Sequence, residues 1–130
     1  LNNFKIINDS AGHLAGDAAL AHVARILEDS TRTSDTVARW GGDEFIILIP
    51  DSETDTAYSV ADKINKKLQQ CPFIYRNRLF ELSFSIGITA KHSGEAPEKI
   101  IERADMASYQ AKKSGQRIIL STLMATETAE

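Results

Sequence analysis

The sequence lacks the features that mark a disulfide-bonded, membrane-spanning or nucleic-acid-binding protein. Its 130 residues include one cysteine, Cys71, which excludes a disulfide within the chain. No apolar run approaches the roughly 20 residues that cross a bilayer, so we expect this domain to make no membrane contact. The formal net charge of −3 provides no basic excess for binding a nucleic-acid polymer. The composition of the chain, with 42% hydrophobic and 25% charged residues, is typical of a globular domain, which we expect to be cytoplasmic.

Hydrophobic spacing predicts three helices. The first is expected to open at Asp17 as its N-cap, after a loop at 8–16 that is rich in Asp, Ser and Gly. The second covers residues 52–70, where apolar residues recur on one helical face. The third begins near Pro97 and stops at Gly115.

Short apolar segments between these helices predict strands. Residues 37–40 and 44–49 flank Gly41 and Gly42, so we expect a hairpin closed by a Gly-Gly turn. Further strands are expected at 73–75, 79–89 and 117–120. The order indicates an α+β domain with an antiparallel-rich central sheet, flanking helices on one face, and an opening strand missing ahead of Leu1.

Asp43 and Glu44 stand at the mouth of the expected turn. Because successive strand residues point to opposite faces, the two carboxylates are expected to have different roles. Carboxylate oxygens at a hairpin tip suit a hard cation such as Mg²⁺, and neighbouring glycines let a bulky ligand approach the backbone. Taken alone, the same residues also fit a plain surface turn.

Several blocks together resemble the GGDEF-domain diguanylate cyclases. Gly41-Gly42-Asp43-Glu44-Phe45 matches the signature after which that family is named. Further blocks agree in order and spacing, at 4–9, 12–13, 16–17, 32–35, 82–88 and 103–112. We therefore expect a GGDEF domain over residues 1–121, followed by a tail or linker at 122–130.

The resemblance implies a fold similar to class III nucleotidyl cyclases and polymerase palm domains, which is ferredoxin-like. It implies condensation of two GTP molecules to cyclic di-GMP with release of two pyrophosphates. Each subunit of a homodimer would hold one GTP, with Mg²⁺ as the cofactor. Since the chain does not start with methionine, we interpret it as part of a larger bacterial signalling protein, such as the cytoplasmic portion of a membrane-anchored sensor.

The catalytic residues follow from the resemblance position by position. Asp43 matches the family's metal-binding carboxylate, which can also help to deprotonate the attacking hydroxyl, and Glu44 matches the second catalytic acid. The family's other metal-binding aspartate corresponds to the position ahead of Leu1.

The resemblance also implies the substrate-binding residues. Asn8 and Asp17 match the pair that reads the guanine edge, for which an amide and a carboxylate offer suitable donors and acceptors. Gly41 and Gly42 leave room for ribose and base, and Lys112 matches a lysine that meets the terminal phosphates.

Arg32 and Asp35 resemble the family's RxxD inhibitory motif, with Lys63 where some members place a second arginine. This implies that cyclic di-GMP is both product and non-competitive inhibitor, because arginine can stack on guanine and bind phosphate together. Without the resemblance, the same two residues would be interpreted as a solvated surface pair.

Two alternatives remain open. Gln116 stands where many members place a phosphate-binding arginine, and Arg117 follows one position later. The first alternative is therefore a catalytically silent regulatory domain that binds GTP or cyclic di-GMP and is attached to an EAL-type phosphodiesterase. The second, a purely structural dimerisation domain, would not require Asn8, Asp17 and Asp43 together.

Overall fold

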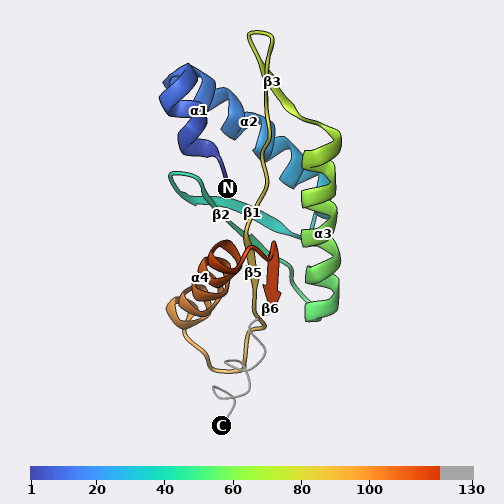
Figure 1. Ribbon diagram of the computed structural model, residues 1–130. Helices are drawn as coiled ribbons and strands as arrows, with labels where there is room; N and C mark the ends of the chain where they lie inside the picture. The colour runs from blue at the N-terminus through green and yellow to red at the C-terminus, as the bar shows by residue number, and fades with distance from the viewer. Residues whose placement is uncertain (121–130) are drawn as a thin grey trace. The chain divides into compact units, whose positions relative to one another are not determined.

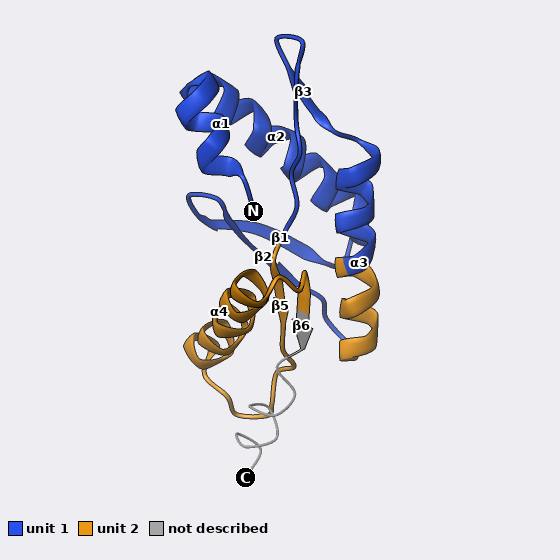
Figure 2. Ribbon diagram, viewed as in Figure 1, with its two compact units in different colours: residues 1–51, 62–84 blue, residues 52–61, 85–130 orange. Residues whose placement is uncertain are grey.

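The computed structural model describes residues 1–120, in which helices alternate with short strands (Figure 1). It forms two compact units, the first from residues 1–51 and 62–84 and the second from residues 52–61 and those from 85 onward (Figure 2). The elements in chain order are α1 Phe4–Ala11, α2 His13–Ser30, β1 Thr36–Gly41, β2 Glu44–Leu48, α3 Thr54–Gln70, β3 Phe73–Tyr75, β4 Arg78–Phe80, β5 Ile86–Ile88, α4 Pro97–Ser114 and β6 Ile118–Leu120. These helices and paired strands confirm the α+β class. Within residues 1–120, no helix is long and apolar enough to cross a membrane.

The segment expected to be a loop is helical, so that prediction was wrong. Residues 8–11 belong to α1, and α2 already begins at His13, which places Asp17 inside the helix and not at its N-cap. Only Gly12 separates the two helices, with a φ of 89° that favours glycine. A single residue with positive φ is enough to redirect the chain, and the polar composition of 8–16 instead reflects helix surfaces facing solvent.

The core of the first unit lies between its helices and strands. Within residues 1–51 and 62–84 its buried apolar side chains include Ile7, Ala15, Ala19, Leu20, Val23, Ile26, Leu27, Ile64, Leu68, Phe73, Phe80, Leu82 and Phe84. The ring of Phe45, from β2, meets the ring of Phe84 edge to face at 6.0 Å between centroids. This contact joins the β1–β2 hairpin to the segment that follows β4.

The strand expected over 79–89 is divided, and one buried side chain explains the division. Asn65, on α3, accepts a hydrogen bond from the backbone N–H of Phe84 at 2.9 Å and donates to the carbonyl of Phe84 at 3.2 Å. The backbone carbonyl of the adjacent residue, Ser83, accepts a hydrogen bond from the backbone N–H of Asn2 at 2.7 Å. A side-chain amide thus takes the place of a strand partner, and regular pairing resumes only at β5.

Strand pairing among the described residues is mostly antiparallel, as predicted. These residues contain three two-stranded sheets, of which β1–β2 and β3–β4 are antiparallel and β5–β6 is parallel. Since each sheet has only two strands, β2 is not buried on both faces, and Leu48 is 60% exposed.

The second unit is built around α4 and the β5–β6 pair. Gly87 permits their close approach, because a Cβ there would lie 2.2 Å from the carbonyl oxygen of Ala104 and 2.4 Å from the backbone nitrogen of Ser108. Beside this contact, the buried Arg103 guanidinium pairs with the carboxylate of Glu95 and donates to the hydroxyl of Thr89 at 2.6 Å. The guanidinium therefore ties the segment after β5 to the middle of α4.

The Glu95–Arg103 pair predicts how stability depends on pH. The hydrogen bond from Arg103 lowers the pKa of Glu95 from 4.5 to about 2, so the ionised carboxylate favours the folded chain. This stabilisation is complete above pH 4.5 and is lost as the pH falls toward 2. In urea unfolding, Glu95→Gln should therefore show a shallower loss of stability across that window than the wild-type chain. Equal slopes for the two chains would contradict the assignment.

Candidate nucleotide site

The expected guanine-reading residues lie where α1 and α2 approach each other. Asn8 is half-buried on α1, and its side-chain oxygen occupies the space that a Cβ on Gly16 would need, at 1.9 Å from it. Gly16 is buried on α2 and is followed directly by the exposed Asp17. The helix contact thus brings the amide of Asn8 next to Gly16, the residue that precedes Asp17.

The acidic pair lies at the tip of the β1–β2 hairpin, as predicted. The predicted Gly-Gly turn was wrong by one residue: the turn consists of Gly42 and Asp43, since Gly41 is still paired with Glu44 as the last rung of the ladder. Gly42 has a φ of 38°, and a Cβ on either glycine would meet no atom within 4 Å. Gly42 therefore supplies the positive φ of the turn, and both glycines leave open space beside it.

Both carbonyl groups of the turn accept hydrogen bonds. The Nε–H of Arg39 donates to the carbonyl of Gly42 at 2.9 Å, a contact that sequence analysis did not predict. The amino nitrogen of Leu1 donates to the carbonyl of Asp43 at 3.2 Å. The start of the described chain therefore lies beside the acidic turn, with Asp43 half-buried and Glu44 exposed.

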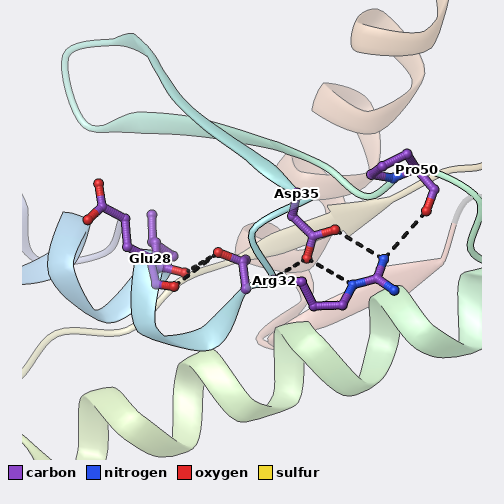
Figure 3. Close-up of polar contacts among 6 residues, drawn as sticks. Glu28, Arg32, Asp35 and Pro50 are labelled. Carbon is purple, nitrogen blue, oxygen red and sulfur yellow. Dashed lines mark hydrogen bonds and ion pairs between the residues drawn. The ribbon is translucent and has the colours of Figure 1, made fainter.

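Arg32 and Asp35 are joined, and the arginine also reaches the far end of the hairpin. Figure 3 shows the Arg32 guanidinium directed at the Asp35 carboxylate, at 3.1 Å, and at the carbonyl of Pro50, at 3.4 Å. Asp35 also accepts the backbone N–H of Arg32 at 2.8 Å, and this bond is the largest cause that lowers the pKa of its carboxyl. The Arg32 side chain remains 56% exposed, while that of Asp35 is 1% exposed. The pair therefore presents an ordered cation to solvent.

The remaining site residues lie on exposed helix surfaces. Lys63 is exposed on the part of α3 that belongs to the first unit. Lys112 is exposed in the last turn of α4, in the second unit, and Gln116 is exposed shortly after that helix ends. The first unit thus contains all the predicted site residues except Lys112.

The carboxylate oxygens of the turn are ligands of the type that Mg²⁺ prefers. Asp43 and Glu44 offer hard carboxylate oxygens, which this ion prefers, and Mg²⁺ commonly binds through one or two carboxylates plus substrate phosphates. Within residues 1–120 no three or more Asp, Glu, His or Cys side chains cluster as a complete metal site. The described residues alone therefore offer a partial set of ligands for the ion.

Comparison with known proteins identifies the family. The model of the diguanylate cyclase GGDEF domain matches residues 1–117. The chain belongs to the GGDEF domain family. This GGDEF domain is 39% identical over 120 residues to diguanylate cyclase A of Treponema denticola, covering 91% of the chain and 32% of that protein. It is 38% identical over 116 residues to diguanylate cyclase DgcP of Pseudomonas aeruginosa, covering 89% of the chain and 17% of that protein.

A solved structure agrees with the assignment. The GGDEF domain of DgcB from Caulobacter crescentus, in complex with c-di-GMP, superposes with a TM-score of 0.87 at 26% identity. The match covers 93% of this chain and 73% of that one. The fold expected from the sequence is thus confirmed as that of GGDEF domains. Since the chain spans about a third or less of diguanylate cyclase A and of DgcP, the activities of these two relatives are properties of longer proteins.

The contact between Asn8 and Gly16 can be tested by a double-mutant cycle. In the wild-type background, Gly16→Ala should be neutral or destabilising, because the new methyl group displaces the Asn8 amide. In an Asn8→Ala background the same change should stabilise the chain by about 0.5–1 kcal/mol, the gain of alanine over glycine inside a helix. Urea unfolding of the four chains measures both effects. The same effect in both backgrounds would show that the two residues do not touch.

Proposed function

We propose that this domain is the catalytic part of a diguanylate cyclase, which condenses two GTP molecules into cyclic di-GMP and two pyrophosphates. The observation that supports this most directly is the hairpin tip, where a glycine turn presents Asp43 and Glu44 beside the open space at Gly41. Membership of the GGDEF family supports the same reaction.

In this proposal the α1–α2 junction binds the base. The Asn8 amide has both a donor and an acceptor, and the Asp17 carboxylate can accept from the ring N–H and the exocyclic amine of guanine. Adenine lacks this pattern of donors, so the pair would select GTP over ATP. Gly41 and Gly42 leave the ribose and phosphates free to approach the turn, and the Lys112 ammonium would neutralise the terminal phosphates.

The reaction forms a bond between the 3′-oxygen of one GTP and the α-phosphorus of the other, and breaks the bond to the leaving pyrophosphate. Positioning and charge neutralisation dominate such phosphoryl-type transfers. Mg²⁺ held by Asp43, with Glu44 nearby, would supply charge stabilisation at the transferred phosphorus. The proton of the attacking hydroxyl leaves to a carboxylate of the turn, for which Asp43 is the candidate, and Glu44 is the second acid.

We further propose that catalysis requires a homodimer. One subunit of this size offers one guanine-reading pair and one acidic turn, while the reaction consumes two nucleotides. Two such sites facing each other would place each 3′-hydroxyl opposite the α-phosphorus of the other GTP. Dimerisation would then follow from the stoichiometry of the chemistry.

The Arg32–Asp35 pair is proposed as the inhibitory site for cyclic di-GMP. The guanidinium is held by Asp35 and Pro50 while the Arg32 side chain is 56% exposed, and an arginine presented in this way can stack on guanine and bind phosphate. Lys63 would add a second cation. Because Asp35 and Pro50 flank the two ends of the hairpin, a ligand there is separated from the acidic turn and inhibits without competing with GTP.

A silent regulatory domain is the second candidate, and Gln116 is the observation that favours it. A glutamine at the position of a phosphate-binding arginine would weaken triphosphate binding by about 1.5–3 kcal/mol if a charged hydrogen bond is lost. Such a domain would bind GTP or cyclic di-GMP and regulate an attached EAL-type phosphodiesterase.

The central test is product formation by the full-length protein with GTP and Mg²⁺. Asp43→Asn keeps the shape of the side chain but removes the charge that would hold the cation, so we expect kcat to fall by about 100-fold or more. Asp29→Asn, a matched change on the exposed surface of α2, should leave kcat within about twofold because surface substitutions cost little. Cyclic di-GMP quantified by chromatography measures both. Binding of GTP without any product would favour the regulatory candidate.

Inhibition is tested by replacing Arg32. Arg32→Ala removes the cation, and Arg32→Lys keeps the charge but loses the planar group, so both should raise the cyclic di-GMP concentration needed for half inhibition. Losing one charged contact of about 1.5–3 kcal/mol predicts a shift of roughly 10-fold or more for the alanine variant. Initial rates over a range of added product give the shift. An inhibition curve identical to that of the wild type would refute this site.

A further inference from the structure

The tip of the β1–β2 hairpin contains an irregularity that the proposed chemistry does not explain. Arg39 pairs with Phe45, and Gly41 pairs with Glu44, so Trp40 is an extra residue without a partner in the ladder. Such a β-bulge bends the strand and disrupts local pairing. The bulged Trp40 is 59% exposed, and the last rung beyond it is formed by a glycine, which has no side chain to pack across the strands. Regular strand pairing therefore does little to fix the turn.

A hydrogen bond from Arg39 crosses this irregularity. Its Nε–H donates at 2.9 Å to the carbonyl of Gly42, which belongs to the peptide group that joins Gly42 to Asp43. The orientation of this peptide sets the backbone at Asp43 and therefore the direction of its side chain. A donor that is part of a cation makes a stronger bond than a neutral one. Arg39 thus restrains the backbone directly ahead of the proposed metal-binding carboxylate.

We propose that Arg39 is a positioning residue for the acidic turn, holding the Gly42–Asp43 peptide so that the Asp43 carboxylate is oriented for a cation and nucleotide phosphates. This inference rests on the proposed function for the role of Asp43. The contact of Arg39 with Gly42 explains how a bulged, glycine-rich tip can present a carboxylate in one orientation. Arg39 acts through the turn and not on the substrate.

The charge of Arg39 and its hydrogen bond have opposite effects on Mg²⁺ binding. A guanidinium near Asp43 and Glu44 repels a metal cation, so removing the charge alone would favour Mg²⁺ binding. Removing the hydrogen bond would loosen the turn and weaken Mg²⁺ binding. Substitutions that remove one property at a time therefore separate positioning from electrostatics.

Glutamine and lysine provide this separation. In Arg39→Gln the side-chain nitrogen follows the same number of carbons as the Nε of arginine, so the donor to Gly42 is kept and the charge is lost. Arg39→Lys keeps the charge but places its donor one bond further out, and Arg39→Leu loses both. Arg25→Gln, on the exposed surface of α2, is the matched control for removing an arginine charge.

The experiment uses the full-length protein and two readouts. The first is hydrogen–deuterium exchange of the backbone amides at 42–45, which reports the rigidity of the turn whether or not the protein is an active enzyme. The second is the Mg²⁺ concentration for half-maximal cyclic di-GMP formation at saturating GTP. We expect Arg39→Lys and Arg39→Leu to accelerate exchange and to raise this concentration about five- to tenfold, the factor for one lost hydrogen bond. Arg39→Gln should keep the exchange of the wild type and need no more Mg²⁺ than the wild type, and Arg25→Gln should remain within about twofold in both readouts.

The two outcomes of exchange decide the inference independently of catalysis. If Arg39→Lys protects the turn as well as the wild type while Arg39→Gln behaves like Arg39→Leu, charge and not the hydrogen bond is responsible, and the proposal is overturned. Unchanged exchange in all variants also overturns it. A wild-type protein that forms no product would refute the proposed reaction, while the exchange pattern would still support or reject the positioning role.

Discussion

The orientation of the peptide between Gly42 and Asp43 is the constraint on which the proposed site depends. Gly42 adopts a φ of 38°, and the carbonyl groups of both turn residues accept hydrogen bonds, from Arg39 and from Leu1. A hairpin tip is otherwise among the less constrained parts of a fold, because few side chains pack there. By holding the backbone from two sides, the fold can present an acidic side chain without burying it. This is the preorganisation that binding a cation and a triphosphate requires.

Close packing at glycine is the second constraint, and it recurs in both units. In the first unit Gly16 admits the amide of Asn8, and in the second Gly87 admits the backbone of α4. The consequences differ. The atom nearest Gly16 is the end of a rotatable side chain, whereas Gly87 faces backbone atoms of Ala104 and Ser108 that cannot move alone. Gly16 therefore leaves room for the side chain of Asn8 in the candidate site, while Gly87 allows α4 to pack closely against β5.

Much of this architecture could be predicted from the sequence where local chemistry decides it. The β1–β2 hairpin, Pro97 at the start of α4 and Gly115 after its end follow from turn and capping preferences, and all are present. The acidic turn and the Arg32–Asp35 pair were also found from their motifs. These features depend on residues close in sequence.

The errors occur where distant residues override local composition. The polar composition of residues 8–16 predicted a loop. The segment is instead helical on either side of Gly12, because the two helices bury Ile7 and Ala15 in the first unit. The strand over 79–89 is interrupted because Asn65, nineteen residues away, takes both backbone groups of Phe84. Neither contact leaves a periodic signal in the sequence. The bond from Arg39 to Gly42 was missed for a related reason, since a charged residue on an exposed strand is usually solvated.

The most direct test of the account is a crystal structure of the full-length protein with Mg²⁺ and a non-hydrolysable analogue of GTP. The account predicts the guanine edge within hydrogen-bonding distance of Asn8 and Asp17, and the metal ion bound to Asp43 between the turn and the phosphates. A nucleotide bound elsewhere, or an Asp43 carboxylate directed away from both metal and phosphates, would contradict it.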